Sequence, residues 1–293
     1  MKIRSIAYSK INLFLKVTGK RPDGYHEILS FFLPLTSPAD NIILTVDDLT
    51  VLYGIEIICR DKRVPTDETN ICHKAATRYA AMTGLPARWR LEIDKKIPVA
   101  AGMGGGSSDA AAVLQMLQKH YKQLPLPVLA RAAAYVGADV PFFMESRPAI
   151  ASGIGEKLEF LPPGLPEIPL VLVNPGFPVS AQWAYENIDP ALIGPADKDR
   201  FNALLSAART GHFKTCASLL HNDLAPAVIH KFPVLQILKN RLVAHGALGA
   251  EMTGSGPTVF AICGDFAHAE KVAAAMRQEF PEMDVFVSGR NLS

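Results

Sequence analysis

The stretch of this sequence with the clearest chemical potential is a glycine-rich segment that holds four glycines within residues 102–106. Glycine carries no side chain, so the backbone N–H groups of such a segment can approach a ligand closely. The pattern predicts a helix from Ser107, which would add the positive end of its dipole and free N–H groups. We therefore expect an anion site, most simply for phosphate. A flexible loop capped by Ser107 is the alternative.

Two common nucleotide-binding loops do not match this segment. A Walker A loop ends in Gly-Lys followed by Ser or Thr, and no such ending stands at the required spacing. The Rossmann fingerprint needs a third glycine, but Ser107 occupies that place, and no long βαβ unit surrounds it. Phosphate binding is thus predicted from the glycine content and the helix start alone.

Lys10 and Asn12 are a second pair that could act chemically. From Ile3 to Val17 the odd positions are mostly apolar, which indicates a strand, and both polar residues stand at even positions. They therefore share one strand face, about 7 Å apart. A lysine on a strand face is more often a solvated charge than a functional group. The pair alone does not decide between these two interpretations of Lys10.

Asp139 and the pair Tyr25-His26 also have structural alternatives. Asp139 precedes Val140-Pro141, which is typical of an N-cap, because Pro is favoured in the first helical turn. Tyr25 and His26 follow Arg-Pro-Asp-Gly at 21–24, a turn signal. Such an adjacent pair ordinarily lies on a surface loop with one aromatic ring anchored.

The elements that must position these residues form an irregular mixture of strands and helices. Because they lack a regular βαβ alternation, the sequence predicts an α+β fold rather than a doubly wound sheet. The densest cluster of chain breakers, at 162–166, indicates two domains, 1–155 and 156–293. The pattern predicts strands at 3–17, 28–35, 42–46, 89–93, 170–173, 258–263 and 284–287, and helices at 67–82, 107–120, 124–136, around 182, 201–208, 213–219, 234–245 and 266–280.

Composition excludes several classes of protein. The 293 residues are 49% hydrophobic and 20% charged, and the net charge is only +2 without basic runs, so nucleic acid is an unfavoured partner. No apolar run reaches the roughly 20 residues of a membrane span, and no signal peptide is evident. The four cysteines have no C-x-x-C spacing. We expect a reduced cytoplasmic protein without a structural metal.

Three motifs that contain glycine or lysine lie at 7–13, 98–108 and 252–260. Their sequences and their order resemble those of the GHMP small-molecule kinases, such as galactokinase, homoserine kinase and mevalonate kinase. The resemblance covers nearly the whole chain. It implies a two-domain GHMP kinase fold, in which a domain like domain 2 of ribosomal protein S5 precedes a ferredoxin-like α/β sandwich. It also implies ATP as phosphate donor.

Motifs at 10–15, 21–27, 104–111 and 137–143 resemble the members of this family that phosphorylate the 2-hydroxyl of CDP-methylerythritol in the non-mevalonate route. The resemblance implies that ATP contacts Pro98, Ala101, Gly102, Met103, Gly104, Gly105, Gly106, Ser107 and Ser108, with adenine near Asn70, Lys95 and Lys96. It implies that the acceptor contacts Asn12, Tyr25, His26, Tyr185, Gly254, Ser255 and Gly256.

The same resemblance implies a role for each reacting group. Asp139 would take the proton of the acceptor hydroxyl or orient it, and Lys10 would keep Asp139 ionised and offset charge on the phosphoryl group. Tyr25 would stack on cytosine, His26 would bond the polar edge of that base, and Tyr185 would cover its other face unless it is a core residue. Mg²⁺ would be held largely by phosphates and water.

Alternatives to this function remain at this stage. Another kinase of the family, of the homoserine or mevalonate type, is the first, and a non-catalytic nucleotide- or RNA-binding module is the second. Ala100-Ala101 stands where many relatives carry glycine, which predicts a slightly stiffer loop. We expect a small-molecule substrate, no nucleic acid or membrane partner, and a monomer or weak homodimer.

Overall fold

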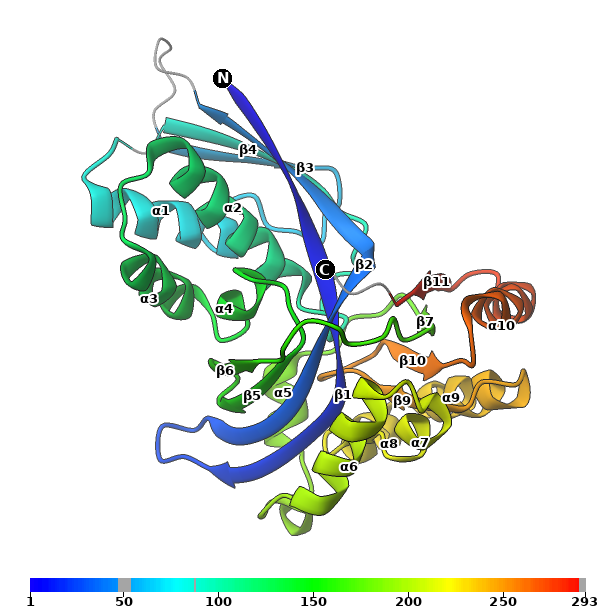
Figure 1. The fold of residues 1–293 in the computed structure, drawn as a ribbon. Coiled ribbons are helices and arrows are strands. Elements are labelled where there is room, and N and C mark those ends of the chain that lie inside the picture. The colour runs from blue at the N-terminus through cyan, green and yellow to red at the C-terminus, as the bar shows by residue number, and fades with distance from the viewer. Residues whose placement is uncertain (47–53, 87, 290–293) are drawn as a thin grey trace. The chain divides into compact units, whose positions relative to one another are not determined.

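The computed structural model describes residues 1–46, 54–86 and 88–289. Within them the chain forms two compact units (Figure 1). Unit 1 comprises Met1–Ser9, Ala39–Val99 and Gly104–Ser146, and unit 2 comprises Lys10–Pro38, Ala100–Met103 and Arg147–Ser293. The glycine-rich segment thus contributes to both units. The predicted boundary between residues 155 and 156 stays a prediction.

Unit 1 contains a sheet in which apolar side chains alternate toward a buried face. Strand β2 (His26–Val46) pairs antiparallel with β4 (Arg88–Asp94), and β4 pairs parallel with β3 (Gly54–Cys59). The first part of β1 (Lys2–Lys20) lies next to β2. The predicted strands at 42–46 and 89–93 are confirmed.

Four helices belong to unit 1: α1 (Ile71–Thr83), α2 (Gly105–Tyr121), α3 (Leu126–Val136) and α4 (Val140–Phe143). Helix α1 begins four residues later than predicted, because Asn70 caps it by accepting from the Cys72 N–H. Helix α2 begins at Gly105 with Gly104 as N-cap, so the predicted start and cap at Ser107 are wrong. Helices α1 and α2 contact each other, and Trp89 lies buried near Tyr79 and Tyr121.

Unit 2 contains the remaining part of the first two strands. Strand β1 pairs parallel with the short β8 (His221–Asn222), and β2 pairs antiparallel with β5 (Ala149–Gly153), which forms a hairpin with β6 (Lys157–Phe160). The sequence pattern did not indicate the hairpin. Residues 9–15 of β1 are continuously buried, so this stretch has no solvated face.

A four-stranded antiparallel sheet forms the other part of unit 2, in the order β11-β7-β10-β9. Its strands are β7 (Leu170–Asn174), β9 (Gly249–Met252), β10 (Val259–Ile262) and β11 (Asp284–Ser288). Helices α9 (Val234–Ala244) and α10 (Phe266–Glu279) contact it and share its apolar core. Placing β7 between β11 and β10 gives the ferredoxin-like arrangement, so the predicted α+β class is confirmed.

The remaining helices of unit 2 connect these strands. They are α5 (Ala181–Glu186), α6 (Lys198–Arg209), α7 (Phe213–Ser218) and α8 (Ala225–Lys231), with a short 3₁₀ helix at Pro190–Leu192. Among the helices of the described ranges, none has both the length and the apolar composition needed to cross a membrane.

Candidate functional site

The glycine-rich segment is a series of left-handed turns that leads into α2. Ala100, Gly102 and Gly104 have φ values of 52°, 73° and 71°, in the region that favours glycine. The Ser108 N–H bonds the Gly104 carbonyl at 2.9 Å, which closes the first helical turn. The N–H groups that precede it in α2 have no acceptor within the helix. Together with the helix dipole, they can bind an anionic group.

Gly102 is required by packing against the third glycine motif. A Cβ atom at Gly102 would overlap the carbonyl oxygen of Thr253 and lie 2.9 Å from the Gly256 nitrogen. A Cβ at Gly254 would in turn lie 2.8 Å from the Gly102 carbonyl oxygen. Gly254 and Gly256 also have positive φ values, 55° and 76°. The two motifs are therefore in backbone contact, and contact of Gly102 with ATP stays a prediction.

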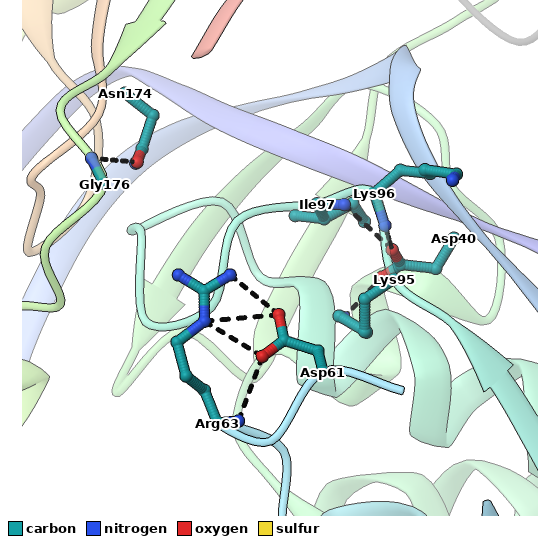
Figure 2. A network of polar contacts seen from close by, with 8 residues as sticks. All are labelled: Asp40, Asp61, Arg63, Lys95, Lys96, Ile97, Asn174 and Gly176. Carbon is teal, nitrogen blue, oxygen red and sulfur yellow. Dashed lines mark hydrogen bonds and ion pairs between the residues drawn. The ribbon is translucent and has the colours of Figure 1, made fainter. Parts of the chain in front are cut away.

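Three buried charged side chains in unit 1, Asp40, Lys95 and Asp109, form what we term the ion cluster. Lys95 Nζ donates to Asp40 Oδ2 at 2.5 Å and to Asp109 Oδ2 at 2.9 Å. The side chains of these three residues are 0%, 6% and 4% exposed, in that order. Figure 2 shows Asp40 and Lys95 beside the backbone of Lys96 and Ile97.

The charges of the ion cluster shift the pKa values of its members. Burial alone would lower the pKa of Lys95, but the carboxylates of Asp109 and Asp40 outweigh it and raise that pKa. Burial raises the pKa of Asp109 and the Asp40 carboxylate adds to this, while Lys95 opposes it. Among the described residues, Asp109 Oδ1 is buried without a hydrogen-bond partner. The cluster thus holds Lys95 as an ammonium and favours a proton on Asp109.

The residues predicted to lie near adenine have different surroundings. Asn70 is buried, and its side chain accepts from the Cys72 N–H at 2.8 Å and donates to the Pro65 carbonyl at 2.5 Å. Lys96 is exposed, with Nζ 3.5 Å from Asp94 Oδ1. Lys95 Nζ is already bonded within the ion cluster. Contact of Asn70, Lys95 and Lys96 with adenine stays a prediction.

Lys10 and Asn12 share one strand face, as predicted, and both are buried. Lys10 Nζ donates to Asn12 Oδ1 at 2.8 Å and lies 4.3 Å from the centre of the Phe32 ring. Lys10 is only 4% exposed, so the alternative of a solvated charge is wrong. Its backbone N–H bonds the Met103 carbonyl at 3.0 Å. Within unit 2, Lys10 therefore lies beside the first half of the glycine-rich segment.

Four uncharged side chains hold the third glycine motif in unit 2; we term Asn12, Ser30, Asn222 and Thr253 the neutral network. The Asn12 N–H donates to Thr253 Oγ1 at 3.0 Å, and Asn12 Nδ2 donates to Ser30 Oγ at 2.8 Å. Asn222 Nδ2 donates to the carbonyls of Met252 and Gly254, at 2.7 and 2.9 Å. Sequence reasoning missed Ser30, Asn222 and Thr253. The motif to which the network binds was predicted to contact the acceptor.

Three residues are predicted to hold the cytosine base. Tyr25 lies on the 21–25 turn, His26 on β2 and Tyr185 on α5. The rings of His26 and Tyr185 are stacked, with centroids 5.4 Å apart and an interplanar angle of 22°. Burial and the charge of Lys20 lower the pKa of His26, which favours a neutral imidazole. Tyr25 is 59% exposed, whereas Tyr185 is partly buried against the core of unit 2. Trp183 lies on the same helix as Tyr185, and the centre of its ring is 3.8 Å from Nζ of Lys231, the last residue of α8.

Asp139 occupies the N-cap position of α4, but its side chain makes no capping hydrogen bond to the described residues of that helix. Its backbone is in the right-handed helical region, with φ −83° and ψ −13°. An N-cap residue usually has an extended backbone and a side chain that accepts from the helix. The interpretation of Asp139 as a side-chain cap is therefore wrong, and its chemical role stays a prediction.

Comparison with family models gives matches in both halves of the chain. The model described as "GHMP kinases N terminal domain" matches residues 70–147, and the one described as "GHMP kinases C terminal" matches residues 204–282. The first range contains α1, the glycine-rich segment and Asp139. The second contains Asn222 and the third glycine motif.

Similar proteins cover the chain almost completely. A 4-diphosphocytidyl-2-C-methyl-D-erythritol kinase of Gloeobacter violaceus is 39% identical over 97% of this chain and 93% of its own. A crystal structure of 4-(cytidine 5'-diphospho)-2C-methyl-D-erythritol kinase has a TM-score of 0.81 at 33% identity, over 98% of this chain and 100% of that one. A homoserine kinase of Cytophaga hutchinsonii has a TM-score of 0.78 at 19% identity, over 99% and 95% of the two chains. At 19% identity, the homoserine kinase shows a likeness of fold alone.

Proposed function

The chain belongs to the 4-diphosphocytidyl-2-C-methyl-D-erythritol kinase family of the GHMP kinases, and from this premise we propose that it phosphorylates the 2-hydroxyl of CDP-methylerythritol with ATP. This reaction is a step of the non-mevalonate route to isoprenoid precursors. The observation that carries the choice of acceptor is the stacked pair of His26 and Tyr185 beside the exposed ring of Tyr25. Such a pair suits a planar base better than homoserine or mevalonate, which have no ring.

The start of α2 would hold the phosphates of ATP. Its first N–H groups and its dipole suit a polyanion, and Gly106 is exposed there, so no side chain blocks the approach. Within residues 1–46, 54–86 and 88–289, no group of three or more His, Cys, Asp or Glu could hold a metal ion. Mg²⁺, which the use of ATP implies, would be held mainly by the ATP phosphates and water. When bound, the ion would neutralise charge on the phosphates.

Asp139 and Lys10 would act directly on the reacting atoms. Asp139 would accept the proton of the acceptor hydroxyl or orient that hydroxyl, the role that the resemblance to the family implies for it. Lys10 would offset negative charge on the transferring phosphoryl group. Its position is fixed by Asn12, which is itself bonded to Ser30 and Thr253.

The acceptor would bind through its base and through its diphosphate. Cytosine would stack on Tyr25 and Tyr185, and the neutral imidazole of His26 would bond its polar edge. The turn at Gly254, Ser255 and Gly256 would contact the diphosphate and methylerythritol part. Base stacking on an aromatic ring typically contributes about 1–3 kcal/mol.

Phosphate transfer with three acceptors tests the function. The purified protein, with ATP and Mg²⁺, is expected to phosphorylate CDP-methylerythritol much faster than homoserine or mevalonate. Equal or faster transfer to homoserine or mevalonate would replace the proposal with one of the other GHMP kinase activities. Absence of transfer to all three, with ATP still bound, would support a non-catalytic nucleotide-binding module.

Substitution of Asp139 separates catalysis from structure. We expect Asp139→Asn to lower kcat by about 10²- to 10⁴-fold, the usual contribution of a general base. The thermal midpoint should change little, because asparagine keeps the shape of the side chain and can still form hydrogen bonds. Turnover within a few-fold of the unmodified protein would exclude Asp139 as the base.

Substitution of Tyr25 tests recognition of the base. Tyr25→Ala should raise the Kd of CDP-methylerythritol roughly 5- to 150-fold, through the loss of one stacking face. ATP affinity should stay the same. Calorimetric titration with each ligand separately checks this, and an equal loss of ATP affinity would show that Tyr25 supports the nucleotide site or the fold.

We also propose that the kinase works in the cytoplasm as a monomer or weak homodimer, without a nucleic-acid partner. The net charge of +2 and the absence of basic runs support the last point. Size-exclusion chromatography with light scattering would measure the oligomeric state.

A further inference from the structure

Asp40 is the fully buried carboxylate of the ion cluster and lies on β2, with Ile42 two residues further on the same buried face. Oδ1 accepts from the Lys96 N–H at 2.5 Å and from the Ile97 N–H at 2.8 Å, and Oδ2 accepts from Lys95 Nζ at 2.5 Å. One side chain thus fixes three successive residues (Figure 2). Buried N–H groups without an acceptor are costly, so this turn depends on Asp40.

The turn held by Asp40 lies against the start of α2. A Cβ atom at Gly105 would lie 2.9 Å from Ile97 Cγ2 and 3.2 Å from Lys95 Nζ, so these two side chains fill the space beneath the first helical residue. Lys95 also bonds Asp109, which lies one turn further along α2. Asp40 therefore reaches the helix start both through Ile97 and through Lys95.

Electrostatic attraction for ATP cannot explain this arrangement. Two carboxyl groups face one ammonium in the ion cluster, and even with a proton on Asp109 the cluster carries no surplus positive charge that could attract phosphates. Its contribution to a phosphate site must come from geometry. A rigid helix start keeps its N–H groups aimed at the ligand and reduces the ordering that binding requires.

We propose that Asp40 is a positioning residue for ATP, which sets the start of α2 through the turn at Lys95–Ile97 without touching the nucleotide. The proposal rests on the proposed function in one respect, that the start of α2 holds the phosphates of ATP. It predicts a selective effect: loss of Asp40 weakens ATP binding and leaves acceptor binding unchanged.

Two variants and a matched control test the proposal. Asp40→Ala removes every acceptor, whereas Asp40→Asn keeps the volume and one acceptor oxygen. Glu56→Gln changes an exposed carboxylate of the same sheet, which pairs with Arg90. For each variant, calorimetry measures the affinity for a non-hydrolysable ATP analogue and for CDP-methylerythritol, and kinetics give the KM of each substrate and kcat.

We expect Asp40→Ala to weaken analogue binding by about tenfold or more, the effect of hydrogen bonds to a charged group. Asp40→Asn should recover part of this loss, and Glu56→Gln should match the unmodified protein. The acceptor Kd should change less than twofold in all three. Should Asp40→Ala fail to fold, Asp40→Asn still carries the comparison.

Two results would overturn the proposal. One is full affinity for the analogue in folded Asp40→Ala and Asp40→Asn. The other is an equal loss of affinity for analogue and acceptor together with a lower thermal midpoint, which would mean that Asp40 only supports the fold. Failure of the proposed function is distinguishable, because it would appear as absent acceptor phosphorylation by the unmodified protein.

Discussion

The ion cluster of unit 1 supports the glycine-rich start of α2, and the neutral network of unit 2 supports the third glycine motif, by different chemistry. In unit 1, Asp40, Lys95 and Asp109 are charged or titratable, and one oxygen of Asp109 lacks a partner among the described residues. In unit 2, Asn222 bonds two carbonyls of the third glycine motif, and its Oδ1 accepts from Leu224. The first arrangement depends on protonation, and the second depends only on geometry.

Because of this difference, the start of α2 and the third glycine motif should respond differently to substitution and to pH. A buried ion without its partner is strongly destabilising, but protonation of a carboxylate can relieve it. A buried carbonyl without its donor has no such relief, because it does not titrate. The loss of stability caused by a substitution should therefore depend on pH in the ion cluster and not in the neutral network. At a single pH, substitutions in either one would only lower the free energy of unfolding.

The largest effect is expected for Lys95→Met, which leaves two buried carboxylates without a cation. Removing one partner of a buried ion pair typically costs about 3–5 kcal/mol. Asp109, whose pKa is already raised in the folded protein, should take up a proton as the pH falls, so the loss should shrink at low pH. Urea unfolding at several pH values measures this. A loss that stays constant from pH 8 to pH 4 would contradict the comparison.

A smaller loss, without pH dependence, is expected for Asn222→Ala. The carbonyls of Met252 and Gly254 and the N–H of Leu224 would lose their partner, at about 1–3 kcal/mol in total after relaxation. The same unfolding series at pH 4 to 8 checks the result. Asn222→Asp is the matched variant, because it keeps the volume and the acceptor but cannot donate to either carbonyl while it is ionised.

The smallest change in stability at neutral pH, within about 1 kcal/mol, is expected for Asp109→Asn, since an amide can still accept from Lys95. The pH dependence of its stability should nevertheless differ from that of the unmodified protein. The pKa of Asp109 is raised in the folded state, so folding takes up a proton there. The resulting stabilisation is complete below the unfolded pKa of about 4 and is lost as the pH rises through the folded pKa. The variant should lack this decline, and identical pH profiles would contradict the shift.

Much of the fold could be predicted because apolar residues repeat with clear periods. The strands at 42–46, 89–93 and 170–173 follow from such patterns, as does the helix at 266–280. The hairpin of β5 and β6 could not be predicted, since its strands are short and only partly buried. The start of α2 was misplaced because Gly104, rather than a serine, occupies the N-cap position.

The contact of Lys10 with Asn12 was predictable, because the alternation of the strand places both residues on one face. Asp40 was missed, although it has the same parity in β2 as the buried residues Ile42 and Leu44, which was an available signal of a buried carboxylate. Asn222 gave no such signal. Its partners lie about 30 residues further along the chain, and only the folded structure brings them together.

The sequence has two tryptophans, and each unit contains one of them. Trp89 is almost inaccessible and donates its indole N–H to Tyr121 at 3.1 Å, whereas Trp183 is partly accessible beneath the Lys231 ammonium. Their fluorescence should therefore differ in wavelength and in quenching by iodide. Trp89→Phe and Trp183→Phe would each leave a single emitter, so the melting of either unit can be followed without an added label. Coincident transitions would show that the units lose their structure cooperatively.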